Sequence, residues 1–409
     1  MNPDKHLRGL VVMRTTIARI VALVGLCALT LPASAQRNNA DPLGGQFGVM
    51  EIALPPQEAA DDISRMSDAL AKLPAQRPGV VDTYVLSVSL WNEPVFENEA
   101  KEAANVLARR YDAADRTIVL SAGKGQGIAR AFPVFSPSNF NAVLGRFGKL
   151  ADPNEDLVVV FVTSHGSPDG TVAIQEKGRM AGGMRAPHLR QSLQQAGIKT
   201  KLLFVSACFS GNYILPFSND DTVILTAAAA DKTSFGCEPS RDWTYFGDAM
   251  FNHALRGGEG IMDAFNMARG IITKWEDDLH AQWQAKPAAQ RAKEQEPQPS
   301  NPQQNAGDHA LGVIAKAESY GQSISCAGHL SFALDRARTG RPLKGLTDIA
   351  SLTSAQAAAQ TRASTEGQAR GRSTQDTAKA IVVASTTALQ VYPAQPADVT
   401  ELATRCMAP

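Results

Sequence analysis

A histidine and a cysteine each follow an apolar run of this sequence. Residues 157–162 lead into Thr-Ser-His165-Gly, and residues 202–205 lead into Ser-Ala-Cys208-Phe-Ser-Gly. At the carboxyl end of a buried strand, a side chain is held by the rigid sheet while its tip reaches solvent, and a nearby glycine lets a substrate backbone approach closely. The two segments therefore predict a thiol and an imidazole at the ends of adjacent strands.

Such a pair suits acyl transfer. The Cys208 thiolate would attack a scissile carbonyl carbon, His165 would accept or supply the proton on the leaving amine, and the N–H groups of Gly166 and Cys208 would stabilise the oxyanion. Either side chain alone is better interpreted as structural, since free cysteines are among the most buried residues. Their matched positions favour the catalytic interpretation. No second cysteine or histidine lies at ligand spacing, so we expect neither zinc nor any other cofactor.

Five short apolar runs supply the sheet that this chemistry needs. They are too short for helices and too continuously apolar for a sheet with one wet face, so we expect buried parallel strands. The runs are Thr83–Leu90, Thr117–Ser121, Asp156–Thr163, Lys201–Ser206 and Thr222–Ala227.

Helical patterns separate and follow these runs. Strand and helix in alternation specify an α/β fold, a three-layer sandwich with a mostly parallel central sheet and reactive groups at the carboxyl ends of its strands. The expected helices are Glu97–Tyr111, Ser138–Leu150, Ala186–Ala196, Tyr245–Leu255 and Gly260–Trp275.

The amino terminus has the features of an export signal. Arg14 and Arg19 precede the apolar run 20–31, and Pro-Ala-Ser-Ala35 supplies the small residues of a cleavage site. The run is shorter than the ~20 residues that span a bilayer, which favours cleavage after Ala35 over an uncleaved anchor. We therefore expect a periplasmic or secreted protein that has no stable membrane anchor once residues 1–35 are removed.

The rest of the chain divides by composition. Residues 36–80 form a lead-in, residues 81–276 the α/β domain, and residues 277–305 a Gln-, Ala- and Pro-rich linker that cannot fold alone. Residues 306–409 form a tail of unknown role, in which residues 380–391 are the last expected strand. Composition also raises the hypothesis that the tail is an inhibitory segment removed by self-cleavage.

Charge and cysteine content limit the partners. The 409 residues include 40 Lys and Arg and 40 Asp and Glu, which predicts no nucleic-acid or anionic-membrane partner. Of the four cysteines left after signal removal, Cys208 must stay free to react, so at most one disulfide can form, and we favour Cys326 with Cys406. The glycine-rich segment 123–127 lacks the ending of a phosphate-binding loop, and we interpret it as a loop beside the active site.

The two reactive segments resemble those of legumain-type cysteine peptidases. Thr-Ser-His165-Gly and Ser-Ala-Cys208-Phe-Ser-Gly are similar to the family's His-Gly and Ala-Cys blocks, and the resemblance continues through residues 226–237 and 244–248. The family has the caspase-like fold and includes the catalytic subunit of the glycosylphosphatidylinositol transamidase. The resemblance implies a caspase-like peptidase domain with His165 and Cys208 as its catalytic pair.

The resemblance also implies the residues of a substrate pocket. Ser234 and Asp248 match positions that line the pocket for the side chain before the scissile bond. Two positions depart from the family: its acidic residue two positions before the nucleophile is Ser206 here, and the arginine expected near the start of the first helix is replaced by Glu97. One hypothesis is an acidic pocket of Glu97 and Asp248 that prefers a basic side chain. The alternative is that both are surface or helix-capping carboxylates.

These features together predict an exported cysteine endopeptidase. It would hydrolyse a peptide or protein substrate through a thioester on Cys208, with His165 as acid and base. One alternative is a transpeptidase or transamidase, in which an amine replaces water at the thioester. A second is a catalytically inactive binding protein on the caspase-like scaffold, which the altered pocket favours and the intact pair of reactive residues disfavours. The sequence gives no indication of the oligomeric state.

Overall fold

The computed structural model describes residues 48–123, 130–257 and 259–407 of the chain. The expected signal, residues 1–35, and most of the glycine-rich loop lie outside the described residues. The chain divides into two units, and every described residue belongs to the second, residues 46–409. None of the described helices combines the length and the apolar composition needed to cross a bilayer.

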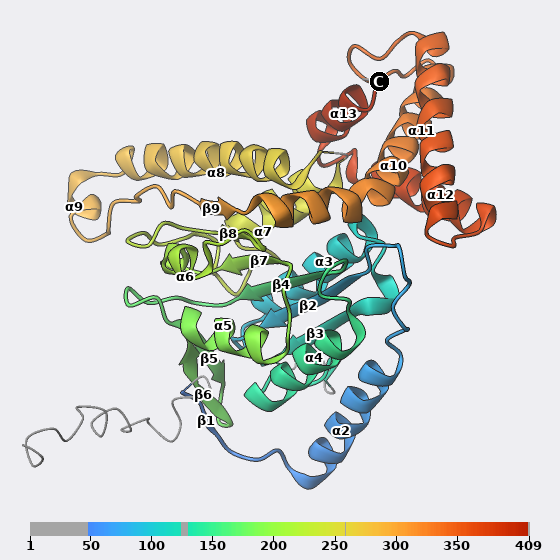
Figure 1. The fold of residues 1–409 in the computed structure, drawn as a ribbon. Coiled ribbons are helices and arrows are strands. Elements are labelled where there is room, and N and C mark those ends of the chain that lie inside the picture. The colour runs from blue at the N-terminus through green and yellow to red at the C-terminus, as the bar shows by residue number, and fades with distance from the viewer. Residues whose placement is uncertain (1–47, 124–129, 258, 408–409) are drawn as a thin grey trace, which may run out of the picture. The chain divides into compact units, whose positions relative to one another are not determined.

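A six-stranded sheet forms the centre of the second unit (Figure 1). Its order is β3-β2-β4-β7-β8-β9, and every neighbouring pair is parallel except β8 and β9. The five predicted strands are confirmed, with each end within one residue of its expected position. The strands are β2 (Thr83–Ser89), β3 (Thr117–Ser121), β4 (Leu157–Thr163), β7 (Lys201–Ser206), β8 (Thr222–Thr226) and β9 (Gln303–Ala306).

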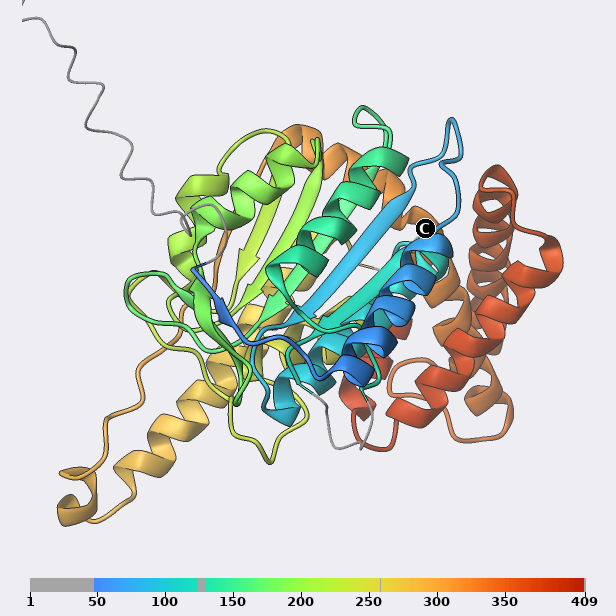
Figure 2. The same cartoon turned by 90° about the horizontal axis from the view of Figure 1, so that it is seen from below.

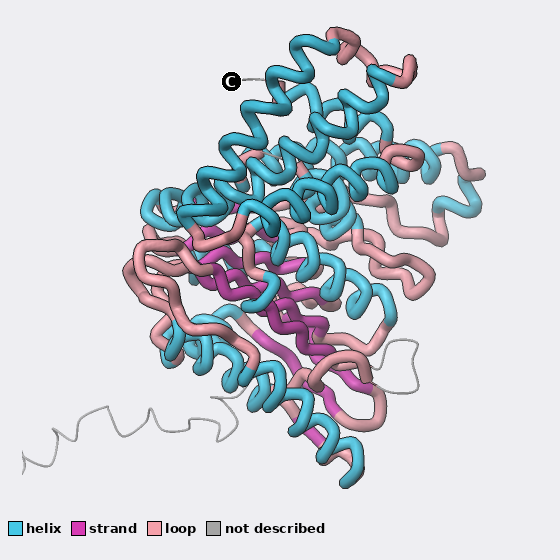
Figure 3. The backbone as a smooth tube through the Cα atoms, turned by 90° about the vertical axis from the view of Figure 1, so that its right-hand side faces the viewer, coloured by secondary structure: helices cyan, strands magenta, loops and turns pink. Residues whose placement is uncertain are grey.

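Helices cover both faces of this sheet (Figure 3). Side chains of β4 alternate between the faces: Val158 and Val160 pack on one side, and Val159 and Phe161 on the other. The three-layer α/β sandwich is therefore confirmed. The first face is covered by α2 (Pro56–Ala71), α4 (Pro137–Leu150), α5 (Ala186–Gln195) and α6 (Ile214–Phe217), and the second by α3 (Pro94–Arg110), α7 (Tyr245–Gly247), α8 (Ile261–Gln284) and the first half of α10 (Asp308–Arg338).

Smaller elements complete the domain. The helix expected over Tyr245–Leu255 is divided into α7, a π-helical segment (Asp248–His253) and a 3₁₀ turn (Ala254–Arg256). A separate three-stranded sheet contains β1 (Met50–Glu51), β5 (Val172–Glu176) and β6 (Met180–Met184). Beyond α8 lie α9 (Ala288–Arg291), α11 (Ile349–Ala369), α12 (Thr374–Val391) and α13 (Pro396–Arg405).

Two expectations for the last third of the chain are wrong. Helix α8 was expected to end at Trp275 but continues to Gln284, and it projects beyond the layers (Figures 1 and 2). Residues 380–391 belong to helix α12 and not to a strand. The β-branched run there suggested a strand, but the buried residues are Thr377, Ile381 and Ala388, which recur at helical spacing.

The tail packs at the amino-terminal ends of the strands. The Arg110 guanidinium, at the end of α3, donates to the Glu318 carboxylate of α10 at 2.8 Å, and both side chains are buried. Gly321 lies so close to α3 that a Cβ atom there would stand 1.9 Å from the carbonyl oxygen of Arg110. The tail is thus attached at the end of the sheet opposite to the carboxyl ends of the strands, so it does not cover them.

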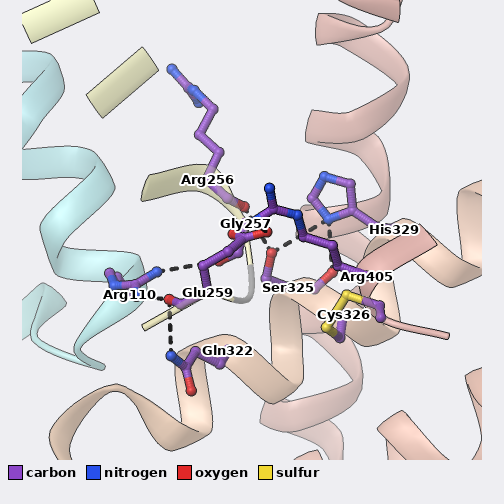
Figure 4. Close-up of a disulfide and its surroundings, with 10 residues drawn as sticks. Arg110, Arg256, Gly257, Glu259, Gln322, Ser325, Cys326, His329 and Arg405 are labelled. Carbon is purple, nitrogen blue, oxygen red and sulfur yellow. Dashed lines mark hydrogen bonds and ion pairs between the residues drawn. A yellow bond between two sulfur atoms is a disulfide. The ribbon is translucent and has the colours of Figure 1, made fainter. Parts of the chain in front are cut away.

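A disulfide joins two helices of the tail. The structure places Cys326 of α10 and Cys406, just after α13, in the pair that the sequence favoured. Figure 4 shows it beside Ser325 and His329; the hydroxyl of Ser325 donates to the carbonyl oxygen of Arg256 at 2.8 Å. The second half of α10 is therefore tied both to α13 and to the segment that precedes α8.

Candidate active site

The carboxyl ends of β4 and β7 bring the predicted catalytic residues together. The two strands pair in parallel register, with Thr163 opposite Ser206. Just beyond, the N–H of Ser164 donates to the carbonyl oxygen of Ser206 at 3.1 Å. His165 and Cys208 each lie two residues after this matched pair, so they occupy equivalent positions on neighbouring segments.

Gly166 packs directly against the backbone of Cys208. A Cβ atom on Gly166 would lie 1.9 Å from the carbonyl oxygen of Cys208 and 3.1 Å from its nitrogen, so a larger residue would force the two segments apart. Within the described part of the chain, neither the N–H of Gly166 nor that of Cys208 donates a hydrogen bond. Two adjacent N–H groups are therefore available to an anionic oxygen.

The thiol of Cys208 is partly exposed and is in contact with Ser234. The N–H of Ser234 donates to its sulfur at 3.2 Å, and the Ser234 hydroxyl oxygen lies 3.5 Å from it. A hydrogen bond from an N–H group stabilises the negative charge of a thiolate. Phe209, the next residue, has a left-handed backbone (φ +58°), and its N–H donates to the carbonyl oxygen of Lys232 at 2.7 Å. This strained turn is held in place directly beside the nucleophile.

The imidazole of His165 is oriented by three side chains. Its Nε2 lies 3.3 Å from a carboxylate oxygen of Glu93. The rings of Trp91 and Phe96 pack edge to face with it, at centroid distances of 5.0 and 4.9 Å. Glu93 was not predicted as a site residue. The strand order could have predicted its position. Glu93 follows β2, the strand beside β4, and the carboxyl ends of parallel strands share one edge of the sheet.

Ser206 lies beneath the site and does not line an open pocket. It is 2% exposed, and its hydroxyl lies 3.1 Å from that of Thr244 and 3.3 Å from a carboxylate oxygen of Glu99. Thr244 in turn caps α7, because its hydroxyl accepts a hydrogen bond from the N–H of Gly247. Ser206 therefore connects β7 to the helix layer.

The structure does not bring Glu97 and Asp248 together as an acidic pocket. Glu97 is buried and accepts a hydrogen bond from the hydroxyl of Ser121. Asp248 lies 3.9 Å from the Arg241 guanidinium and 3.6 Å from Nε2 of His253. In the described ranges the two carboxylates share no hydrogen-bond or ion-pair partner. The Arg241 guanidinium beside Asp248 reduces the negative potential that this carboxylate would present to a substrate.

Glu99 is a site carboxylate that the sequence did not reveal. It belongs to α3 and is fully buried. It accepts hydrogen bonds from the hydroxyls of Thr163, Thr244 (2.7 Å) and Ser206 (3.3 Å). Burial raises the pKa of Glu99 to about 7, although these hydrogen bonds lower it. The spacing along the helix could have revealed this burial, because Glu99 lies four residues before Ala103 and so on the apolar face of α3.

A cavity of about 320 Å³ lies at the other end of the domain. It is bordered by α3, α10, α12 and α13, with Arg110, Gly321 and Leu402 in its lining. None of the residues around His165 and Cys208 takes part in that lining. The cavity is therefore a feature of the tail attachment and not a substrate pocket for the thiol.

Residues 133–288 match the model of the Peptidase C13 family, and they include His165, Cys208, Ser234 and Asp248. Over this segment the match confirms the resemblance to the legumain-type peptidases. Among solved structures, caspase-1 from Spodoptera frugiperda matches with 13% sequence identity and a TM-score of 0.38, over 57% of this chain and 89% of that one. No curated protein sequence matches the chain.

Proposed function

Because residues 133–288 match a family of cysteine peptidases, we propose that this chain is an endopeptidase with Cys208 as its nucleophile and His165 as its general acid and base. The observation that carries the proposal is the matched pair of strand ends, in which Gly166 and Cys208 touch through their backbones. That contact supports the proposal, because peptide-bond cleavage by a thiol requires a nucleophile, a base and N–H donors for the oxyanion at one place.

The reaction proceeds through a thioester. The sulfur of Cys208 bonds to the carbonyl carbon of the substrate, and the N–H groups of Gly166 and Cys208 hydrogen-bond to the oxygen that becomes negative. His165 protonates the leaving amine as the carbon–nitrogen bond breaks. A water molecule then attacks the thioester, gives a proton to His165, and releases the acid and the thiolate. Glu93 orients the imidazole ring.

The substrate is a peptide or protein, and its side-chain preference is open to a direct experiment. The surroundings of Asp248 give little support to a pocket for basic residues, because Arg241 and His253 lie beside it. We expect mass-spectrometric mapping of a mixed peptide library to show cleavage with no dominant preference for Lys or Arg. A cleavage pattern confined to those two residues would restore the acidic-pocket hypothesis. Added amine nucleophiles that end up in the products would identify a transpeptidase.

Export to the periplasm or the extracellular space is part of the proposal. It is supported by the signal-like amino terminus and by the disulfide between Cys326 and Cys406, since such bonds persist in oxidising compartments. Amino-terminal sequencing of the protein secreted or released from the periplasm is expected to begin at Gln36. A mature chain that retains the apolar run 20–31 would contradict cleavage.

A further inference from the structure

We propose that Glu99 is a positioning residue, a buried carboxylate on α3 that holds the carboxyl ends of β4 and β7 so that His165 and Cys208 face a substrate together. The inference rests on the proposed function, because it gives Glu99 a role in the reaction assigned to that pair. It concerns a residue that lies outside the segment matched by the family model.

One carboxylate connects the two catalytic segments. Thr163 lies two residues before His165, Ser206 lies two residues before Cys208, and both hydroxyls donate to Glu99. A third hydroxyl, that of Thr244, donates from the cap of α7. An ionised carboxylate accepts hydrogen bonds and donates none, so it suits three hydroxyl donors. Movement of either strand end would break a hydrogen bond to the same group.

The surrounding backbone leaves room for this carboxylate. A Cβ atom on Gly247, in α7, would lie 1.8 Å from an oxygen of Glu99, so the glycine is needed for the carboxylate to fit. Glycine is an unfavourable residue in a helix. Glu99 also lies against Ser206, the position at which legumain-type sequences carry an acidic residue. Strand β7 has a serine at this position, and the carboxylate beside it comes from α3 instead.

Glu99 is difficult to explain as a stabilising residue. In the described part of the chain it forms no ion pair. Burial raises its pKa above the ordinary 4.5, to about 7. The folded protein therefore binds the proton more tightly than the unfolded chain does, and stability falls as the pH rises from about 4.5 towards 7. A role in the active site explains why a carboxylate that destabilises the fold at neutral pH is present, whereas a role in stabilising the core does not.

The test compares Glu99→Gln with Glu102→Gln, a partly exposed carboxylate on the same helix. For Glu99→Gln we expect kcat to fall by about 10-fold or more at pH 7.5, with little change in KM. We expect its melting temperature at pH 8 to equal or exceed that of the wild type, and the loss of stability between pH 5 and 8 to become smaller. Glu102→Gln should leave all four quantities unchanged. The variant Thr163→Val, which removes one donor, should lower kcat in the same direction.

Two results would overturn the inference. One is a Glu99→Gln variant as active as Glu102→Gln, and the other is an activity loss that parallels a lower melting temperature at pH 8. The rate at which iodoacetamide labels Cys208, read by mass spectrometry, gives an independent measurement. If the wild type cleaves no peptide, the proposed function fails, and labelling still decides the inference: a several-fold change in Glu99→Gln supports it, and an unchanged rate overturns it.

Discussion

Replacement of Cys208 with Ala is expected to lower kcat/KM for peptide hydrolysis by at least about 10⁴-fold, because no other group can form the thioester. The fold should persist, since the Cys208 side chain is partly exposed and its replacement with Ala removes only the sulfur atom. Cleavage of the best peptide from the library measures the first effect. The melting curve measures the second.

Cys237 provides the matched control. It is the other free cysteine of the described chain, and burial raises the pKa of its thiol far above the usual range, so it is a poor nucleophile. Cys237→Ala should therefore retain most of the activity, and iodoacetamide near neutral pH should label Cys208 first. Full activity in Cys208→Ala would refute the assignment. Slow labelling of Cys208 together with no hydrolysis would favour a binding protein on the same scaffold.

The sequence predicts the parts of this fold whose signals are local. Five strands and their order along the chain follow from short apolar runs, and His165 and Cys208 follow from the residues directly after two of them. Strand β9 was missed because its sequence, Gln-Gln-Asn-Ala, has no apolar run, and it is stabilised by pairing with β8. The tail strand was mispredicted because two β-branched residues of the run, Val382 and Val383, lie on the exposed face of helix α12.

Residues that act through tertiary contacts are harder to predict from sequence. Glu93 and Glu99 each look like charged residues at the start of a helix. Only the order of the sheet places Glu93 beside His165, and only the packing of α3 on β2 and β4 brings Glu99 within hydrogen-bond distance of both strand ends. For Asp248, the match to a pocket position gave no information on the arginine and histidine beside it.

Removal of the charge of Glu318 is expected to have the largest effect on stability. Glu318→Gln leaves the guanidinium of Arg110 buried, 2% exposed, with no carboxylate partner. The loss of one member of a buried ion pair costs about 3–5 kcal/mol. We therefore expect the free energy of unfolding, from urea titration, to fall by that amount. Both α3 and α10 line the core of the second sheet face, so the tail and the peptidase domain should unfold together.

Two further variants distinguish the cost of leaving a buried charge without its partner from the cost of losing an ion pair in general. Glu294→Gln removes an exposed pair with Lys286 and should change the free energy of unfolding by less than about 1 kcal/mol. The double variant Arg110→Met with Glu318→Leu removes both buried charges and should recover part of the lost stability, because apolar residues of similar volume can replace a buried pair. If Glu318→Gln is no more harmful than Glu294→Gln, the pair is not what attaches the tail. A tail held by this pair at the amino-terminal ends of the strands leaves the opposite edge, with Cys208 and His165, open to substrate.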